Sequence, residues 1–352
     1  QGIEEFDKTV VRNLIVKLLS LVLIFIVIRT PDDLWKYFAI YVGAELIGNI
    51  TLWLYLPKYL EKINLEKIEL KKHIKPIMAL FVPQIAIQIY TVLDKTMIGK
   101  LTGNMVEVGY YEQAQKIVKA ALTVIAALQT VMNSRIANAY ASKNEKEVKD
   151  CLKKSFDFVW ILAIPMVFGL IAGAPKFVPW YYGEGFDGVT PILMATAPIL
   201  IATGLNGITG IQYLVQIGKQ KIFTMSVTIG AITNVILNLI LIHFFNGVGA
   251  AIASVIAEIV IFGIQLKYFK EQFKILEILK LGIKCFISGL VMFIVVKLLT
   301  DTLPISIINT IIEVIIGGTI YVVVLMILKY EFLKDLINQL LSGLKMKKGR
   351  DM

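Results

Sequence analysis

The chain has 352 residues, of which 57% are hydrophobic and 18% are charged, with a formal net charge of +10. Its mean hydropathy of +0.73 is far above what a soluble domain needs for its core, which excludes an ordinary soluble protein. The alternating ten-residue pattern of an outer-membrane barrel is absent, so the sequence predicts an all-α polytopic membrane protein.

Ten apolar segments are long enough to cross a hydrocarbon layer of about 30 Å at about 1.5 Å per residue. In chain order they are residues 10–28, 35–56, 75–97, 106–139, 151–173, 189–216, 221–243, 248–268, 280–299 and 306–329. We therefore expect ten transmembrane helices.

Lysine residues gather in every second loop. They cluster at residues 58–75, 143–154, 219–221 and 267–284, whereas the intervening loops hold few basic residues. Because cytoplasmic loops collect Lys and Arg, we expect these four segments and both chain ends in the cytoplasm. The same loops account for most of the positive charge, so the charge requires no nucleic-acid partner.

The chain begins with the acidic stretch QGIEEFDKTVV, unlike the basic start of a secretory signal, and we interpret it as the C-terminal part of a longer protein. No GxxxxGK[ST] phosphate loop is present, which argues against ATP hydrolysis. His73 is expected at a cytoplasmic end of its span and His243 at an outer end, so the two histidines cannot form a metal site. We predict neither a cofactor nor a metal.

Polar residues inside the third span form a stripe. Gln84, Gln88, Thr91 and Lys95 follow one another at spacings of four, three and four, which places them on one helix face with Asp94 at its edge. A charged side chain that faces lipid at the bilayer centre costs about 2.5 kcal/mol or more. The stripe is therefore expected to face water or other polar groups.

The fourth span repeats this pattern. Its polar face consists of Glu112, Lys116, Lys119, Thr123, Thr130 and Asn133. An alternative stays open, in which Lys95 and Lys116 extend to the outer interface or pair with Asp94 and Glu112.

Isolated polar residues mark three further spans. Asn234 and Asn238 lie one turn apart in the seventh span, Glu258 lies about ten residues into the eighth, and Glu45 and Asn49 share a face of the second. Each acid fits either a structural partner for an amide or a lysine, or a proton site, and the sequence favours neither.

Four long segments carry a family resemblance. They are PQIAIQIYTVLDKTMIG, GYYEQAQKIVKAALTVIAALQTVMNSRIANAYA, YYGEGFDGVTPILMATAPILIA and GAITNVILNLILIHFFNGVGAAIASVIAEIV. With the first span, QGIEEFDKTVVRNLIVKLLSLVLIFIVI, they resemble the polysaccharide repeat-unit flippases, the Wzx-type branch of the MOP exporter superfamily. The resemblance covers nearly the whole chain.

This resemblance implies two pseudo-symmetric six-helix lobes around a central cavity, with two extra C-terminal helices in fourteen-helix members. Residues 1–66 would be the last two helices of the first lobe with a basic linker, 67–272 the complete second lobe, and 273–352 the extra pair with a basic cytoplasmic tail. The first four helices of such a protein would be absent.

The resemblance also implies a function, the transfer of undecaprenyl-diphosphate-linked oligosaccharides from the inner to the outer leaflet by alternating access. The glycan would serve capsule, exopolysaccharide or O-antigen assembly in a bacterial plasma membrane. Implied partners are membrane lipids, a polysaccharide polymerase and a chain-length regulator. The expected substrate ligands are Lys95, Lys116, Lys119 and Arg135 for the anionic headgroup, and Gln84, Gln88, Gln115, Asn234 and Asn238 for sugars or the cavity wall. Asp94, Glu112, Glu258 and Glu45 are the candidates for charge pairing or ion coupling.

Three other functions stay open. A multidrug or cation antiporter of the same superfamily should favour acidic cavity residues, whereas the two stripes hold three lysines against two acids. A lipid II flippase is compatible with the same features. A membrane polysaccharide polymerase, an enzyme, would usually carry a large outer loop, but the longest outer loop expected here is only about GAPKFVPWYYGEGFDG.

Overall fold

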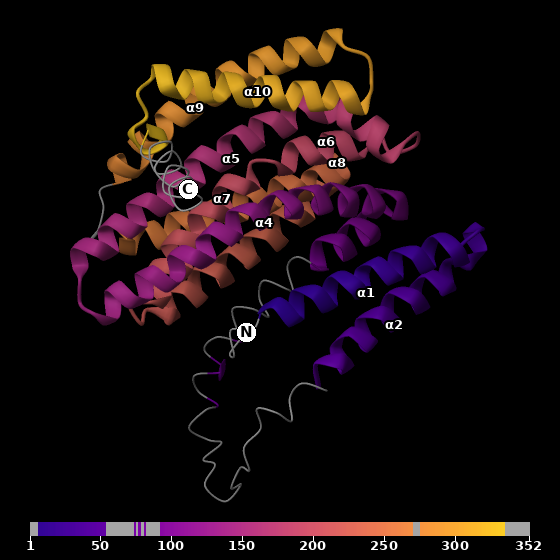
Figure 1. The fold of residues 1–352 in the computed structure, drawn as a ribbon, viewed down its shortest axis with the longest axis horizontal. Helices are drawn as coiled ribbons and strands as arrows, with labels where there is room; N and C mark the ends of the chain where they lie inside the picture. The colour runs from indigo at the N-terminus through magenta and orange to yellow at the C-terminus, as the bar shows by residue number, and fades with distance from the viewer. Residues whose placement is uncertain are drawn as a thin grey trace, which may run out of the picture. The chain divides into compact units, whose positions relative to one another are not determined.

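The computed structural model describes residues 6–53, 74, 77–78, 81, 92–269 and 275–334, and the chain divides into two compact units, Gln1–Leu70 and Lys71–Met352. Throughout these described residues the regular secondary structure is helical, as predicted (Figure 1). Each unit is considered by itself.

The first unit is a helical hairpin made of α1 (Phe6–Val27), a short 3₁₀ turn η1 (Pro31–Asp33) and α2 (Leu34–Trp53). Asp33 closes the turn, because its carboxylate accepts from the backbone N–H groups of Arg29 and Thr30 at 2.9 and 3.1 Å and pairs with Lys36 at 2.6 Å. The hydrogen bond from Lys36 and those from the two backbone groups hold the pKa of Asp33 well below its usual range.

The first continuous helix described in the second unit is the segment 92–102. The elements that follow are α4 (Met105–Ala141), α5 (Glu145–Tyr182), α6 (Val189–Thr196), α7 (Ile199–Asn206), the π-helix η4 (Gly207–Val215), α8 (Gln220–Phe269), α9 (Ile275–Thr302) and α10 (Ile307–Ile327).

Six of the described helical stretches are long and apolar enough to cross a membrane, with α6, α7 and η4 forming one of them. The 50-residue α8 is too long for a single crossing, and Asn246, with φ 50° and ψ −130°, divides it into two helices. These halves correspond to the predicted spans 221–243 and 248–268. The predicted span 75–97 lies largely outside the described residues, as does the tail from residue 335.

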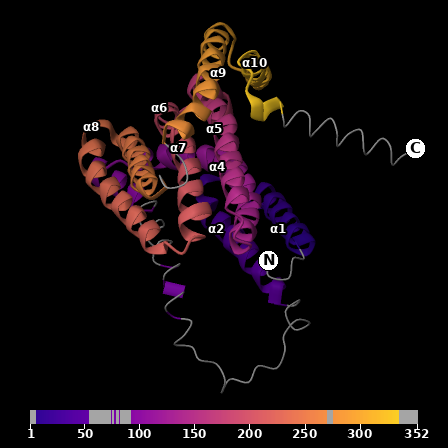
Figure 2. The same ribbon diagram turned by 90° about the vertical axis from the view of Figure 1, so that its left-hand side faces the viewer.

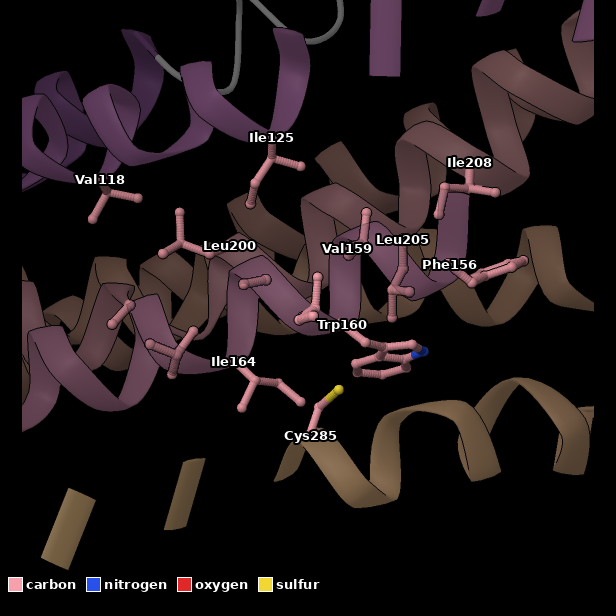
Figure 3. Packing of buried hydrophobic residues seen from close by; sticks show 14 of the residues in the cluster. Val118, Ile125, Phe156, Val159, Trp160, Ile164, Leu200, Leu205, Ile208 and Cys285 are labelled. Atoms are coloured by element: carbon pink, nitrogen blue, oxygen red, sulfur yellow. The ribbon is translucent and has the colours of Figure 1, made fainter. Parts of the chain in front are cut away.

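The core of the second unit forms where α4, α5 and α7 meet. Buried Ile125, Val159 and Leu200 pack there from these three helices (Figure 3). Helices α9 and α10 pack on α5 (Figure 2), and Tyr330 after α10 donates a 2.6 Å hydrogen bond to buried Asp157 of α5. This buried frame leaves the other faces of α4 and α8 to position polar residues.

The two halves of α8 touch through their backbones at Gly249. A Cβ atom there would overlap the carbonyl group of Leu241, whereas one at Gly263, further along the same element, would meet nothing within 4 Å. We expect Gly249→Ala to destabilise the protein by about 1–3 kcal/mol, because backbone atoms must separate to admit the methyl group. Thermal unfolding of the purified protein should show the loss, and Gly263→Ala is the matched control. Equal melting temperatures for the two variants would contradict the hairpin geometry.

Candidate functional site

Asp94 lies at the centre of a buried polar cluster. It belongs to the segment 92–102 and only 2% of its surface is exposed. Its Oδ2 accepts from the hydroxyls of Tyr111 on α4 and Ser254 on α8, at 2.8 and 2.9 Å, and its Oδ1 accepts from Nδ2 of Asn238 at 2.6 Å. Three neutral donors, from α4 and from both halves of α8, therefore hold the carboxylate.

The hairpin of α8 assembles the rest of this cluster. Asn234 and Asn238 share a face of its first half, one turn apart, and Nδ2 of Asn238 reaches Oδ1 of Asn234 at 3.0 Å. Nδ2 of Asn234 in turn donates to Ser254, on the second half, at 3.2 Å. The turn at Asn246 is thus what brings these two helices of α8 around Asp94.

Oxygen atoms dominate this cluster. Oδ1 of the fully buried Asn238 finds no hydrogen-bond partner among the described residues. The carboxylate of Asp94, the hydroxyls of Tyr111 and Ser254 and the amide oxygens of Asn234 and Asn238 are oxygen atoms of the kind that a hard monovalent cation prefers, and the carboxylate can also accept a proton. Within the described part of the chain there is no group of three or more His, Cys, Asp or Glu residues that could hold a metal ion.

Lys95, the neighbour of Asp94, points elsewhere. Its ammonium pairs with the carboxylate of Glu112 on α4, and both side chains are about one third exposed. Adjacent residues on a helix project about 100° apart, so one position can enter the interior while the next faces outward. Of the alternatives left open for Lys95, pairing with an acid is found, and the acid is Glu112. Such an exposed pair contributes about 1 kcal/mol or less to stability.

One face of α4 stays uncovered along most of the helix. The side chains of Lys116, Lys119, Thr123, Thr130 and Ser134 are exposed on it. The opposite face is buried through apolar residues, among them Val118, Ile125, Met132 and Ile136. Exposed Val124 and Val131 lie beside these polar residues, so the open side of α4 is mixed in polarity. Its lysines need water or other polar groups beside them, because a charged side chain that faces lipid is costly. Glu112 pairs with Lys95, and neither Lys116 nor Lys119 forms an ion pair with another described residue.

Arg135 lies near the other end of the same helix. It is exposed and lines a pocket of about 490 Å³ between α4 and α5 with Lys146, Lys154 and the acids Glu147 and Asp150. Nineteen residues separate it from Lys116, which corresponds to about 28 Å along a helix. The structure therefore does not bring Arg135 together with the two lysines.

The remaining expected site residues fall in different places. Asn234 and Asn238 have no exposed surface, so they belong to the Asp94 cluster and do not line a cavity wall as expected. Gln115 is half-buried on α4, and Glu45 is exposed on α2. Gln84 and Gln88 lie outside the described residues.

Glu258 is buried with an amide partner. Its side chain is 7% exposed, and Asn206 at the end of α7 donates to its Oε2 at 2.5 Å and to its backbone carbonyl at 3.0 Å. An amide partner was one of the two alternatives that the sequence left open.

Three residues of these clusters were missed from the sequence. Ser254, Tyr111 and Asn206 were not among the candidate residues, although the first two bond to Asp94 and the third bonds to Glu258. The spacing of four between Ser254 and Glu258 was the available signal, because it places the two polar residues on one face of α8.

Two family models match the chain. A model described as polysaccharide biosynthesis protein matches residues 1–133, and the MatE model matches residues 79–240. A putative O-antigen transporter of Escherichia coli (strain K12) is 22% identical over 274 residues, covering 77% of this chain and 66% of the transporter. A probable low-salt glycan biosynthesis flippase, Agl15 of Haloferax volcanii, is 25% identical over 169 residues, covering 48% of this chain and 35% of that protein.

The fold is similar to a solved flippase structure. A lipid II flippase MurJ in an inward closed conformation superposes with a TM-score of 0.69 at 22% identity, over 87% of this chain and 64% of that chain. This likeness confirms the predicted MOP-like helical architecture. The chain spans about two thirds of the length of the O-antigen transporter and of the solved flippase.

Proposed function

We propose that this chain, a Wzx-type member of the MOP exporter superfamily, translocates undecaprenyl-diphosphate-linked oligosaccharides from the inner to the outer leaflet. The glycan would serve capsule, exopolysaccharide or O-antigen assembly. The names of the curated relatives, a transporter of O-antigen and a flippase for glycan biosynthesis, support this substrate class.

The open polar face of α4 is the observation that carries the proposal. A diphosphate needs cations and hydrogen-bond donors in a wet site, while an isoprenoid tail can stay in lipid. Lys116 and Lys119 supply two ammonium groups on that face, free of ion pairs with other described residues, and Thr123 and Thr130 continue it with hydroxyls. Phosphate bound there would form charge-assisted hydrogen bonds with both lysines.

Movement of the lipid-linked substrate is proposed to be coupled to a cation at Asp94. The carboxylate is buried and its described partners are neutral, so protonation or a bound cation would change the charge of this cluster by one unit. Since the segment 92–102 packs against α4 through the bond between Tyr111 and Asp94, this charge change acts on the helix that presents the lysines.

The proposed arrangement places residues 67–272 in one six-helix lobe, 273–352 in two extra helices with a basic tail, and 1–66 in two helices of the other lobe. We propose a bacterial plasma membrane as the location, with the lysine-rich loops and both ends of the chain in the cytoplasm. A polymerase and a chain-length regulator would act on the translocated glycan, and the chain itself is proposed to have no enzymatic activity.

Deleting the gene tests this function. The expected result is loss of one surface polysaccharide together with accumulation of its undecaprenyl-diphosphate-linked repeat unit, because assembly stops before the outer leaflet. The full-length gene should restore the polymer. Surface polysaccharide at the normal level, with increased sensitivity to cationic dyes, would instead identify a cation antiporter. Accumulation of single repeat units on the outer leaflet would identify a polymerase.

A further inference from the structure

A second buried polar cluster lies next to the Asp94 cluster. Glu258 follows Ser254 by four residues, so the two side chains share a face of α8 about one turn apart. Ser254 bonds to Asp94, and Glu258 bonds to Asn206. A buried acid therefore neighbours the proposed cation site along a single helix face.

Polar contacts continue beyond Glu258. Gln265, seven residues further along α8, accepts from Thr209 of η4 at 2.5 Å and donates to Ser226 at 3.0 Å. All three of these side chains are buried. The distance from Ser254 to Gln265 is about 16 Å along the helix, roughly half of a hydrocarbon layer. Buried Ile261 separates Glu258 from Gln265 on this face, so the polar contacts form two groups.

The amide oxygens of this region lack donors. Oδ1 of Asn206, Oε1 of Gln212 and Oδ1 of Asn238 are buried and have no hydrogen-bond partner among the described residues. Buried polar groups usually have partners, so three orphaned acceptors in one region need an explanation. Each of them would be satisfied by a cation or by a donor such as water.

The orientation of these amides is fixed by their nitrogen atoms. Nδ2 of Asn206 faces the carboxylate of Glu258, Nδ2 of Asn238 faces that of Asp94, and Nε2 of Gln212 faces the carbonyl of Gln129 at 3.3 Å. Exchanging oxygen for nitrogen would set acceptor against acceptor in all three places. While both carboxyl groups are ionised, the unpartnered atoms are therefore the oxygens.

We propose that Glu258 and Oδ1 of Asn206 form a second position for a monovalent cation, and that the turn of α8 from Ser254 to Glu258 connects it with Asp94. This inference rests on the proposed ion coupling at Asp94. The carboxylate supplies the charge, and the orphaned amide oxygens supply neutral ligands for Na⁺ or for a hydrated proton. The π-helical form of η4, a geometry found often at functional sites, places Thr209 and Gln212 beside this route.

Equilibrium binding of radioactive Na⁺ to the purified full-length protein, with choline as the replacement ion, tests the sodium form of the proposal. Wild type should bind two ions per chain, and Asp94→Asn and Glu258→Gln should each bind one. Asn206→Ala should keep two positions but weaken one by about tenfold, because a ligand oxygen is lost while the carboxylate stays. Glu313→Gln, a change at a buried acid on α10, is the matched control and should bind two.

The proton form predicts a different signal. If the cation is a proton, infrared difference spectra on acidification should show a carboxylic-acid band that is reduced in Glu258→Gln and intact in Glu313→Gln. Melting curves identify any variant that fails to fold, and Glu258→Asp should then restore binding or the band. The proposal would be overturned if a folded Glu258→Gln protein bound as many sodium ions as wild type and also kept the full carboxylic-acid band. These measurements need no glycan, so their failure is separate from failure of the proposed transport.

Discussion

Replacing Asp94 by Asn should abolish transport while leaving the protein folded. The amide keeps the volume of the side chain but removes the charge that would hold the coupling cation. A carboxylate about 4 Å from a monovalent cation stabilises its binding by about 4 kcal/mol at an effective dielectric constant of about 20. Cation affinity should therefore fall by roughly a thousandfold. Complementation of the deletion strain by the full-length gene, at matched membrane abundance, is the measurement.

Asp157→Asn is the matched control for this prediction. Asp157 is also buried and also accepts a hydrogen bond from a tyrosine, Tyr330, but it lies between α5 and the end of α10, away from the cluster. This variant should retain complementation. Wild-type polymer levels from Asp94→Asn would show that the carboxylate acts only as a structural hydrogen-bond acceptor, and would contradict its proposed role in ion coupling.

The second large effect is expected at Lys116 and Lys119. Each ammonium is proposed to contact a phosphate, and a hydrogen bond to a charged group contributes about 1.5–3 kcal/mol. We expect each single alanine substitution to reduce translocation by about tenfold or more, and the double substitution by about a hundredfold. Lys116→Arg should retain more activity than Lys116→Ala, because positive charge is what the site requires. Polymer yield in the complemented deletion strain measures all four.

The stability of the lysine variants should differ little from wild type, in contrast to their activity. Both lysines are exposed and have no ion pair with another described residue, so their removal should leave membrane abundance near the wild-type level. Lys100→Ala, at an exposed lysine on the segment 92–102, is the control. Normal polymer levels in the double alanine variant would show that the open face of α4 is a solvated surface with no role in substrate binding.

Helix positions could be predicted because they depend on local composition. The boundaries of α1, α9 and α10 and the division of α8 agree with apolar segments that are visible in the sequence. The polar stripe of α4 could also be predicted, since a spacing of three and four fixes a helix face before any tertiary contact forms.

The composition of the Asp94 cluster could not be predicted in the same way. Its partners Asn238 and Ser254 lie 144 and 160 residues further along the chain, and only the packing of α8 beside the segment 92–102 joins them. Lys95 could have paired with Asp94 or with Glu112. It pairs with Glu112, because neighbouring positions on a helix point in different directions and Asp94 alone points into the interior. A serine among small residues looks like a packing position, so its spacing of four from Glu258 was the one signal that Ser254 gave.

Translocation in reconstituted vesicles tests the central claim most directly. Purified full-length protein would be incorporated into liposomes that carry an undecaprenyl-diphosphate-linked oligosaccharide in both leaflets, and an impermeant glycosidase would be added outside. We predict that glycan of the inner leaflet becomes accessible much faster than in protein-free vesicles, and that Lys116→Ala with Lys119→Ala removes this acceleration. Accessibility at the protein-free rate with folded wild-type protein and an imposed cation gradient would contradict a flippase role.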